Sequence, residues 1–366
     1  MAVPAFMQKY MKENKATLAA EEKNSGVIKE WIDSGCYIFN ALLSADIYKG
    51  FASNKVTCIA GEKATGKSWY CMQAVKAFLD KYKDGICIYY DSESTLSKQM
   101  LDDRGIDSDR VIIDEVITIE EFRTKAKNFL NNYEETPKKE RVPVIMVLDS
   151  LGQLASEAEV SNAAEGKNVR DMQKQQIMKS ALRVATVQAG KLDIPIFITA
   201  HTYKEMGLFP KTIVAGGEAL QYAASSIIML SKSQIKEGTE KVGNFITCTA
   251  YKSRFTKEGT KVQTELRFDT GLNRYYGLLD IAVKCGICKC IAKKYVFNDD
   301  EKPKTEKQIY SNPEQYFTKD VLDKINEYVK VAFSYGSSAS AFNYDENESN
   351  ENELDENTEN EIENIE

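Results

Sequence analysis

The chain has 366 residues, and 43% of them are hydrophobic, a share that is typical of a folded globular protein. No apolar run approaches the roughly 20 residues that a membrane-spanning helix needs, which excludes a helical membrane protein. Residues 1–18 alternate Lys and Glu with apolar side chains, so we expect no secretory signal and a cytoplasmic location. The eight cysteines would then stay reduced, and five of them are expected as small buried hydrophobes: Cys36, Cys58, Cys71, Cys87 and Cys248.

The net charge of −7 is distributed unevenly along the chain. Residues 345–366 carry 11 acidic side chains and neither Lys nor Arg, which leaves a net charge of +4 on the remaining chain. A segment so rich in Asn, Glu and Asp cannot bury enough apolar surface to fold, so we expect a disordered acidic tail at residues 337–366. Composition leaves two roles open: a solubilising tail, or an electrostatic competitor that covers a basic surface or docks a basic partner.

Short apolar runs alternate with longer helical segments through most of the chain. Strands that are apolar throughout and separated by helices predict a mostly parallel sheet covered on both faces, and hence an α/β fold. The last two strands, joined through residues 257–260, are expected to pair as an antiparallel hairpin at the sheet edge. In chain order we expect strands at 55–60, 86–90, 144–148, 194–199, 226–230, 245–251 and 262–268, and helices at 67–82, 119–133, 168–189 and 319–333.

Four segments of the chain are predicted to form separate parts. We expect an N-terminal helical element at residues 1–35, a core at 36–283, a small C-terminal subdomain at 284–336, and the tail. Within the core, the polar loops at 156–167 and 202–217 are longer than connections in compact domains usually are, which favours a functional role.

A phosphate-binding loop is predicted at residues 61–68, which match G-x-x-x-x-G-K-[ST] between an expected strand and an expected helix. The glycines let the backbone curl so that its N–H groups converge on phosphates at a helix N-terminus. Lys67 would reach the β- and γ-phosphates and Ser68 would ligate Mg²⁺, so we expect ATP and Mg²⁺ as cofactors. The predicted nucleotide contacts are Gly61, Glu62, Lys63, Ala64, Thr65, Gly66, Lys67, Ser68 and Trp69.

Carboxylates follow two of the expected strands. Asp149 ends the run at 144–148, where it would orient a Mg²⁺-bound water, although an Asp before a helix is also a favoured N-cap. Hydrolysis also needs a group that orients or deprotonates the attacking water, and Glu93, after the run at 86–90, suits this role. Asp91 is the competing residue, and spacing alone does not separate the two.

Five ordered motifs together resemble the RecA-type recombinases. They are the phosphate loop, residues 90–93, residues 147–151, residues 197–203 and residues 216–220. The stretches 149–155, 178–180 and 277–280 resemble the bacteriophage branch of that family, typified by UvsX of T4-like phages. The resemblance runs from about residue 36 to residue 286. It implies a RecA-like P-loop ATPase core, and an N-terminal element that packs against the next subunit.

The resemblance also assigns catalytic roles. Glu93 occupies the place of the family's catalytic glutamate, and His201 the place of a polar sensor of the γ-phosphate. Lys252 and Arg254 resemble paired basic residues that reach a neighbouring subunit's γ-phosphate, since positions i and i+2 of a strand project to one face. Without the resemblance, the residues favour other interpretations. A lone histidine is more often a structural residue, and two cations on an edge strand more often form a solvated face.

Both long loops take the family's DNA-binding role. Cations give salt-sensitive phosphate contacts, and apolar or aromatic side chains can stack on bases, so the binding is expected to be neutral to sequence. Taken singly, each of these lysines would be read as solvated surface. The predicted DNA contacts are Lys167, Arg170, Lys179, Tyr203, Lys204, Met206, Phe209, Lys211, Gly216 and Gly217.

Two features depart from the family pattern. Met100 stands where a tyrosine often stacks on adenine, so the base contact is expected to be apolar or supplied elsewhere. Cys285, Cys288 and Cys290 offer three thiolates without an evident fourth ligand, which argues against zinc.

The expected function is that of a DNA-dependent ATPase and recombinase. It would form a helical filament on single-stranded DNA and promote pairing and strand exchange with double-stranded DNA, because a filament turns weak contacts of each protomer into strong binding. A single-strand binding protein and a mediator are implied as partners, inside an infected bacterium. The alternatives are a RecA-fold helicase or other P-loop ATPase, and a non-catalytic recombination mediator.

Overall fold

The computed structural model describes residues 3–14, 16–18, 26–167, 171–205, 212–297 and 302–336. Its centre is a ten-stranded mixed sheet with the order β12-β11-β10-β9-β3-β7-β6-β4-β5, and β8 pairs with β7 outside this order. The strands from β9 through β3, β7, β6 and β4 to β5 run parallel, and β9 to β12 run antiparallel. The strands are β3 Val56–Gly61, β4 Ile86–Asp91, β5 Val111–Glu115, β6 Val144–Asp149, β7 Ile196–Lys204, β8 Thr212–Val214, β9 Ser226–Glu237, β10 Glu240–Ser253, β11 Lys261–Arg267 and β12 Gly271–Leu272. The predicted α/β fold with a mostly parallel sheet is confirmed.

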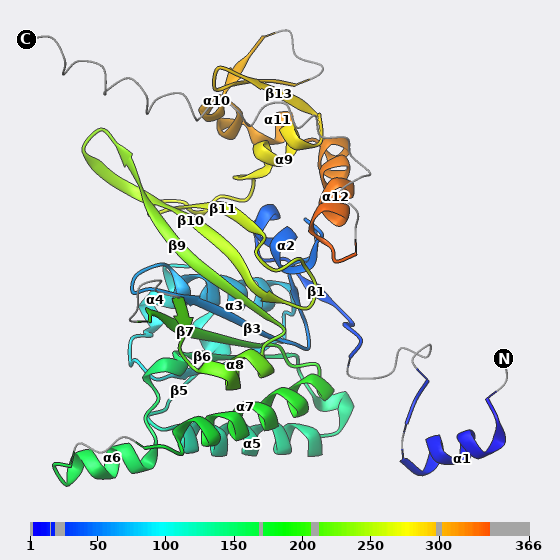
Figure 1. The fold of residues 1–366 in the computed structure, drawn as a ribbon, viewed down its shortest axis with the longest axis vertical. Coiled ribbons are helices and arrows are strands. Elements are labelled where there is room, and N and C mark those ends of the chain that lie inside the picture. The colour runs from blue at the N-terminus through cyan, green and yellow to red at the C-terminus, as the bar shows by residue number, and fades with distance from the viewer. Residues whose placement is uncertain are drawn as a thin grey trace, which may run out of the picture.

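Helices cover both faces of this sheet, and the strand sequences show why. Successive residues of β6 point to opposite sides, with Ile145 and Val147 in one hydrophobic cluster and Met146 and Leu148 in the other. Helices α2 and α3 pack in the first cluster, and α5, α7 and α8 in the second. Figure 1 shows α5 and α7 lying side by side. These helices are α2 Tyr37–Ser44, α3 Lys67–Lys81, α5 Ile119–Glu135, α7 Lys174–Lys191 and α8 Gly217–Ala223.

The antiparallel part of the sheet is larger than expected. The predicted pairing of β10 with β11 is confirmed, but β9 and β10 also pair with each other along twelve register positions. This hairpin extends beyond the sheet (Figure 1). The predicted strands at 226–230 and 245–251 were too short because most side chains from Ser231 to Lys241 are exposed and polar. Backbone hydrogen bonds between β9 and β10 stabilise this hairpin. Its sequence therefore has no hydrophobic run from which the full strand length could be predicted. Strand β5 was missed for a related reason, since it is an edge strand that buries none of its side chains.

The two long polar segments that were predicted as loops contain a helix and strands. Residues 156–167 contain helix α6, Glu157–Ala164, which begins with a capping box in which Ser156 and Glu159 bond each other's backbone N–H. Residues 202–217 contain the end of β7 and strand β8, which pair antiparallel with Thr202 opposite Val214. The predicted helix start at 168 was also early, because α7 begins at Lys174.

The chain ends are built differently from each other. Helix α1, Ala5–Asn14, has no buried residue and lies apart from the sheet in Figure 1. The segment after residue 277 instead shares its hydrophobic cluster with α2 and α3, and the predicted boundary at 283/284 falls within α9. Its elements are α9 Leu278–Lys284, β13 Cys288–Ile291, β14 Lys294–Phe297, β15 Lys304–Thr305, α10 Glu306–Ser311, α11 Pro313–Tyr316 and α12 Lys319–Phe333. Elsewhere in the chain lie the short strand pair β1 Trp31–Ile32 and β2 Phe51–Ala52, and helix α4 Lys98–Asp102.

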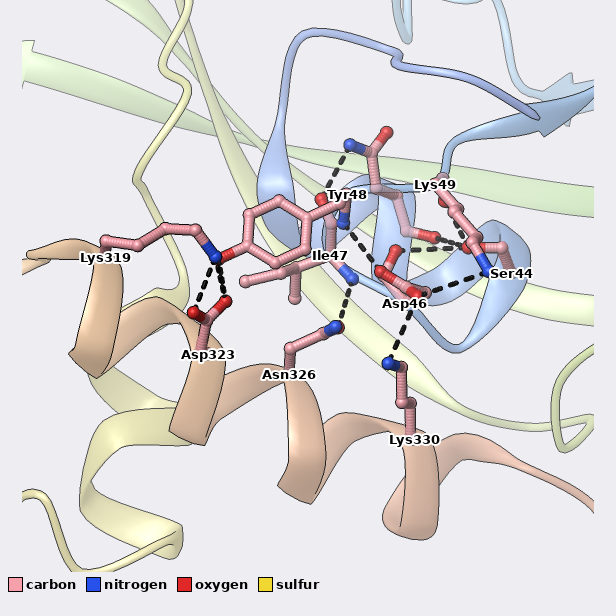
Figure 2. Close-up of polar contacts among 10 residues, drawn as sticks. Ser44, Asp46, Ile47, Tyr48, Lys49, Lys319, Asp323, Asn326 and Lys330 are labelled. Atoms are coloured by element: carbon pink, nitrogen blue, oxygen red, sulfur yellow. Dashed lines mark hydrogen bonds and ion pairs between the residues drawn. The ribbon is translucent and has the colours of Figure 1, made fainter. Parts of the chain in front are cut away.

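Helix α12 is held against the segment after α2 by polar contacts (Figure 2). Asn326 is buried, and its Oδ1 accepts a hydrogen bond of 2.8 Å from the Ile47 N–H. The Tyr48 hydroxyl donates to Asp323 at 2.7 Å, and Lys330 lies 3.6 Å from Asp46. The C-terminal helix is therefore anchored to the start of the core. The expected acidic tail at 337–366 lies outside the described residues.

Candidate functional site

The phosphate loop joins the central strand β3 to helix α3, as predicted. Gly66 has a φ of +96°, a left-handed conformation that side chains disfavour, and it stands immediately before Lys67, the first residue of α3. A side chain on Gly61 would meet the Thr65 hydroxyl at 2.5 Å and the Leu230 carbonyl at 2.9 Å. The loop therefore needs glycine at both positions, and it presents the N-terminus of a 15-residue helix.

Lys67 is buried at this loop, and its Nζ donates to the Glu62 carbonyl at 3.0 Å. Burial lowers the pKa of Lys67, and the nearby carboxylates of Asp149 and Glu93 act in the opposite direction. The ammonium thus lies at the loop and near acidic side chains at the end of β6 and just after β4. A phosphate group at the loop would replace the Glu62 carbonyl as its partner.

Asp149 ends β6 with 4% of its surface exposed. Its Oδ2 accepts a hydrogen bond of 2.6 Å from the Tyr89 hydroxyl, and its Oδ1 accepts one from the Thr199 hydroxyl. These bonds orient the carboxylate and leave it further acceptor capacity. Ser68, half-buried on the first turn of α3, offers a hydroxyl oxygen. Carboxylate and hydroxyl oxygens suit Mg²⁺, so the two predicted ligands fit this ion. Asp149 is not a helix N-cap, since the short helical turn that follows begins after Ser150.

The structure separates Glu93 from Asp91. Asp91 is 2% exposed, and its carboxylate accepts backbone N–H bonds of 2.9 Å from Glu93, Thr95 and Leu96. Glu93 keeps 30% of its side chain exposed and accepts a hydrogen bond of 2.8 Å from the Ser150 hydroxyl. Asp91 therefore shapes the turn, and Glu93 is the carboxylate that a water at this edge can reach.

His201 connects Glu93 to the β7–β8 hairpin. Its Nε2 lies 3.3 Å from the Glu93 Oε1, and its own position on β7 is opposite Gly61 on β3. The His201 carbonyl accepts a hydrogen bond of 2.7 Å from the Ala215 N–H, at the base of the hairpin. The residue thus contacts Glu93 with its side chain and the predicted DNA-binding segment with its backbone.

The two predicted cations lie near each other at the end of β10: burial lowers the pKa of Lys252, and repulsion from the nearby Arg254 lowers it further. A bulge between Ala250 and Lys252 interrupts the register of β10, and Arg254 lies beyond the strand end. Lys252 is half-buried and donates to the carbonyls of Gln221 and Ala224 at the end of α8, the latter at 2.9 Å. Arg254 is exposed. Within this chain, Lys252 caps a helix and Arg254 is the cation that faces outward.

The predicted DNA contacts are divided among several elements. Lys167 is exposed and pairs with Glu165 at 2.6 Å, and Lys179 on α7 lies over the Tyr222 ring of α8, 5.1 Å from its centroid. Tyr203 and Lys204 are exposed at the end of β7. Gly216 and Gly217 open α8. Arg170, Met206, Phe209 and Lys211 lie outside the described residues.

A cavity of about 730 Å³ adjoins the phosphate loop. Its wall includes Trp69, Arg104 and Phe268. Met100 is not part of this wall; it is partly buried and packs against the hydrophobic cluster. The prediction of Met100 as a base contact stays a prediction.

Sequence reasoning missed four residues at the site. Tyr89, Thr199 and Ser150 orient the two carboxylates, as described above. Lys232 on β9 donates to the Ala64 carbonyl of the phosphate loop at 2.6 Å. Only pairing of distant strands brings these residues to the loop, so no local motif could have identified them.

The cysteines separate into two groups. The five predicted as buried hydrophobes are buried free thiols, and burial raises the pKa of Cys36 to about 11. Cys285 is partly buried, Cys288 buried and Cys290 exposed. Within the described ranges, no group of three or more Cys, His, Asp or Glu side chains is placed to hold a metal ion. No helix in those ranges is long and apolar enough to cross a membrane.

Known proteins are similar to this chain in sequence. The family profile of the RecA N-terminal domain matches residues 2–273. The recombination and repair protein of Enterobacteria phage T4 is 34% identical over 249 residues, which cover 68% of this chain and 62% of that protein. Protein RecA of Tropheryma whipplei is 24% identical over 256 residues, 69% of this chain and 56% of the relative. Protein RecA of Lactobacillus johnsonii is 25% identical over 322 residues, 86% of this chain and 83% of the relative.

The T4 match confirms the resemblance to the bacteriophage branch. This chain spans about three fifths of the length of the T4 and Tropheryma proteins. The profile match covers most of the chain and includes the phosphate loop and the ends of β3, β4, β6 and β7. The chain therefore belongs to the RecA family.

Proposed function

We propose that this protein is an ATP-dependent DNA recombinase that assembles on single-stranded DNA and exchanges strands with a homologous duplex. The observation that carries the proposal is the position of His201. One residue joins the Glu93 carboxylate at the nucleotide edge to the base of the β7–β8 hairpin, so occupancy of either site can alter the other. Family membership supports the same activity.

ATP binds with its phosphates on the loop at the start of α3. Lys67 is the cation beside the β- and γ-phosphates, and Mg²⁺ held by Ser68 and Asp149 neutralises part of their charge. Glu93 orients the attacking water, because its carboxylate is accessible and is held by the Ser150 hydroxyl. Tyr89 and Thr199 keep Asp149 in place, as partners of metal ligands commonly do.

Hydrolysis requires a second protomer. Arg254 is exposed and reaches the neighbour's γ-phosphate, where an added cation stabilises the transition state. Lys252 joins it by exchanging its bonds to the end of α8 for the same phosphate. This exchange would report the neighbour's nucleotide to α8, which follows directly on the β7–β8 hairpin.

Two exposed apolar surfaces support a filament. Helix α1 presents Phe6 at 70% and Tyr10 at 57% exposure. The edge strand β5 presents Ile112 at 55% exposure, and Ile117, two residues beyond its end, is 68% exposed. Unpaired edges and apolar patches of this kind are docking surfaces for another chain. Contact of α1 and the residues that follow it with the next protomer would cover both.

DNA lies along the β7–β8 hairpin and the α6–α7 region. Tyr203 offers a stacking face, and Lys167, Lys179 and Lys204 offer phosphate contacts. A single-strand binding protein and a mediator are further partners, and the site of action is the cytoplasm of an infected bacterium.

ATP turnover measured with and without single-stranded DNA tests the proposal. The parent should hydrolyse ATP faster with DNA, and Lys67→Ala should abolish turnover under both conditions. Lys83→Ala is the matched control, since Lys83 is exposed beyond the C-terminal end of α3 and should retain activity. Turnover that is indifferent to DNA would favour another P-loop ATPase, and a strand-exchange assay then separates a recombinase from a helicase.

A further inference from the structure

Strand β9 contacts the phosphate loop at two places. Leu230 is the last residue of β9 that pairs with β3, and its partner is Gly61, the first residue of the loop. A Cβ atom at Gly61 would lie only 2.9 Å from the Leu230 carbonyl oxygen, so the two backbones are in close contact. Beyond this pair, β9 continues into its hairpin with β10, and the loop leads into α3. The loop therefore begins against the base of the β9–β10 hairpin.

Lys232 makes the second contact. It lies two residues after Leu230, and alternate residues of a strand share a face. Its backbone pairs opposite Ile246 of β10, so the side chain starts from a strand that is fixed in the sheet. Its Nζ donates to the Ala64 carbonyl at 2.6 Å, a short bond of the kind that a charged donor makes. Lys232 therefore ties the middle of the loop to β9.

Ala64 is a residue whose backbone needs such support. Its φ is +58°, in the left-handed region that residues with a Cβ atom rarely adopt, and a conformation of this kind persists only where the surroundings enforce it. The Ala64 carbonyl and the Thr65 N–H belong to one peptide plane, so a bond that fixes the carbonyl also fixes the direction of the N–H. Backbone N–H groups are the donors with which such a loop binds phosphates. The bond from Lys232 therefore acts on a phosphate-binding group.

We propose that Lys232 is a positioning residue for nucleotide binding: it holds the Ala64–Thr65 peptide in the orientation that receives phosphates. This inference rests on the proposed function, since it takes the phosphate loop as an ATP site. It adds a residue outside the loop motif on which phosphate binding depends, and it connects the β9–β10 hairpin to the nucleotide. Burial is the main cause of the lowered pKa of Lys67, and repulsion from Lys232 adds to it, so the two ammonium groups lie near each other.

The experiment measures the binding of ATP and of ADP to the full chain with Mg²⁺ by calorimetric titration. Lys232→Met keeps the length of the side chain and removes the ammonium, so both nucleotides should bind about tenfold more weakly. The two losses should be equal, because Lys232 acts on the loop and not on the γ-phosphate. Lys232→Arg keeps a cationic donor and should restore most of the affinity. Lys236→Met is the matched control, since Lys236 is exposed four residues farther along β9.

A second background separates positioning of the loop from the general loss of a surface charge. Glycine adopts a positive φ without steric cost, so Ala64→Gly should make the loop less dependent on Lys232. In that background, Lys232→Met should weaken both nucleotides by about threefold or less, because the binding-competent loop conformation stays populated. Lys232→Gln serves as a second variant in both backgrounds should Lys232→Met fail to fold.

Equal losses for ATP and ADP, recovery in Lys232→Arg and a smaller loss beside Ala64→Gly support the assignment. Unchanged affinity in Lys232→Met, the same loss in both backgrounds, or an equal loss in Lys236→Met would overturn it while leaving the ATP site intact. A loss confined to ATP would also overturn it, since Lys232 would then be a direct ligand of the γ-phosphate. A parent that binds neither nucleotide overturns the proposed function itself.

Discussion

The carboxyl edge of the parallel strands and the β7–β8 hairpin beside it are built in opposite ways. At the edge, Lys67 is buried and donates to the Glu62 carbonyl of the phosphate loop, and Asp149 is buried and bonded to side chains from other strands. On the hairpin, Tyr203 and Lys204 are exposed to solvent. Hydrolysis needs groups held in place before the substrate arrives, whereas binding to a long polymer can add many weak contacts. His201 is the residue that belongs to both regions.

The largest effect is expected at the rigid edge. Glu93→Gln keeps the size of the side chain and its bond to Ser150 but removes the charge that orients water, so steady-state ATP turnover should fall about 10³-fold. Binding of ATP and of single-stranded DNA, measured by fluorescence anisotropy, should stay near the parental level. A variant with turnover within a few-fold of the parent would remove Glu93 from the chemistry.

A second effect tests whether the edge is complete within one protomer. Arg254→Ala should lower DNA-stimulated turnover by about 10²-fold, since Lys252 remains to supply a partial charge. Mixing Arg254→Ala with Glu93→Gln should restore part of the activity, because some interfaces then combine an intact Glu93 with an intact Arg254. Lys257→Ala, a nearby cation bonded to the Ala332 carbonyl, is the control and should not be rescued by mixing. Mixtures without any recovery would contradict a shared site.

The hairpin should respond more gently. Tyr203→Ala removes one stacking face and should weaken single-stranded DNA binding by about tenfold for a short oligonucleotide. On long DNA the loss should be larger, because each protomer of a filament carries the same change. Lys204→Ala should instead reduce the salt dependence of binding. Turnover at saturating DNA should be unchanged in both, and a loss there would show that the hairpin is part of the catalytic edge.

The same contrast between buried and exposed contacts can be measured away from both regions, at the α12 anchor of Figure 2. Asn326→Ala leaves the buried Ile47 N–H unpaired and should lower the free energy of unfolding by about 1–3 kcal/mol in denaturant titrations. Lys319→Ala removes an exposed ion pair with Asp323 and should cost less than about 1 kcal/mol. Equal costs would mean that burial does not set the strength of these contacts.

Much of the core could be read from local patterns. The phosphate loop, the helix at Lys67–Lys81 and the strand ends at Asp91 and Asp149 follow from glycine spacing and uninterrupted apolar runs. The exposed elements could not be predicted from local patterns. Helix α6, the β9–β10 arm and β8 carry polar sequences that are typical of loops, and capping bonds or backbone pairing stabilise them.

The sequence by itself determined the motif order and the fold class, and it predicted the charged residues of the candidate site. Only the tertiary structure decided which of these residues are bonded to other parts of the chain and which stay accessible. It assigned Asp91 to the turn and left Glu93 accessible, attached Lys252 to the end of α8, and brought Lys232 to the phosphate loop. The physical reason is that these pairings join residues far apart in the chain, and burial and hydrogen bonding between strands decide them. The spacing of residues along the sequence cannot decide these pairings.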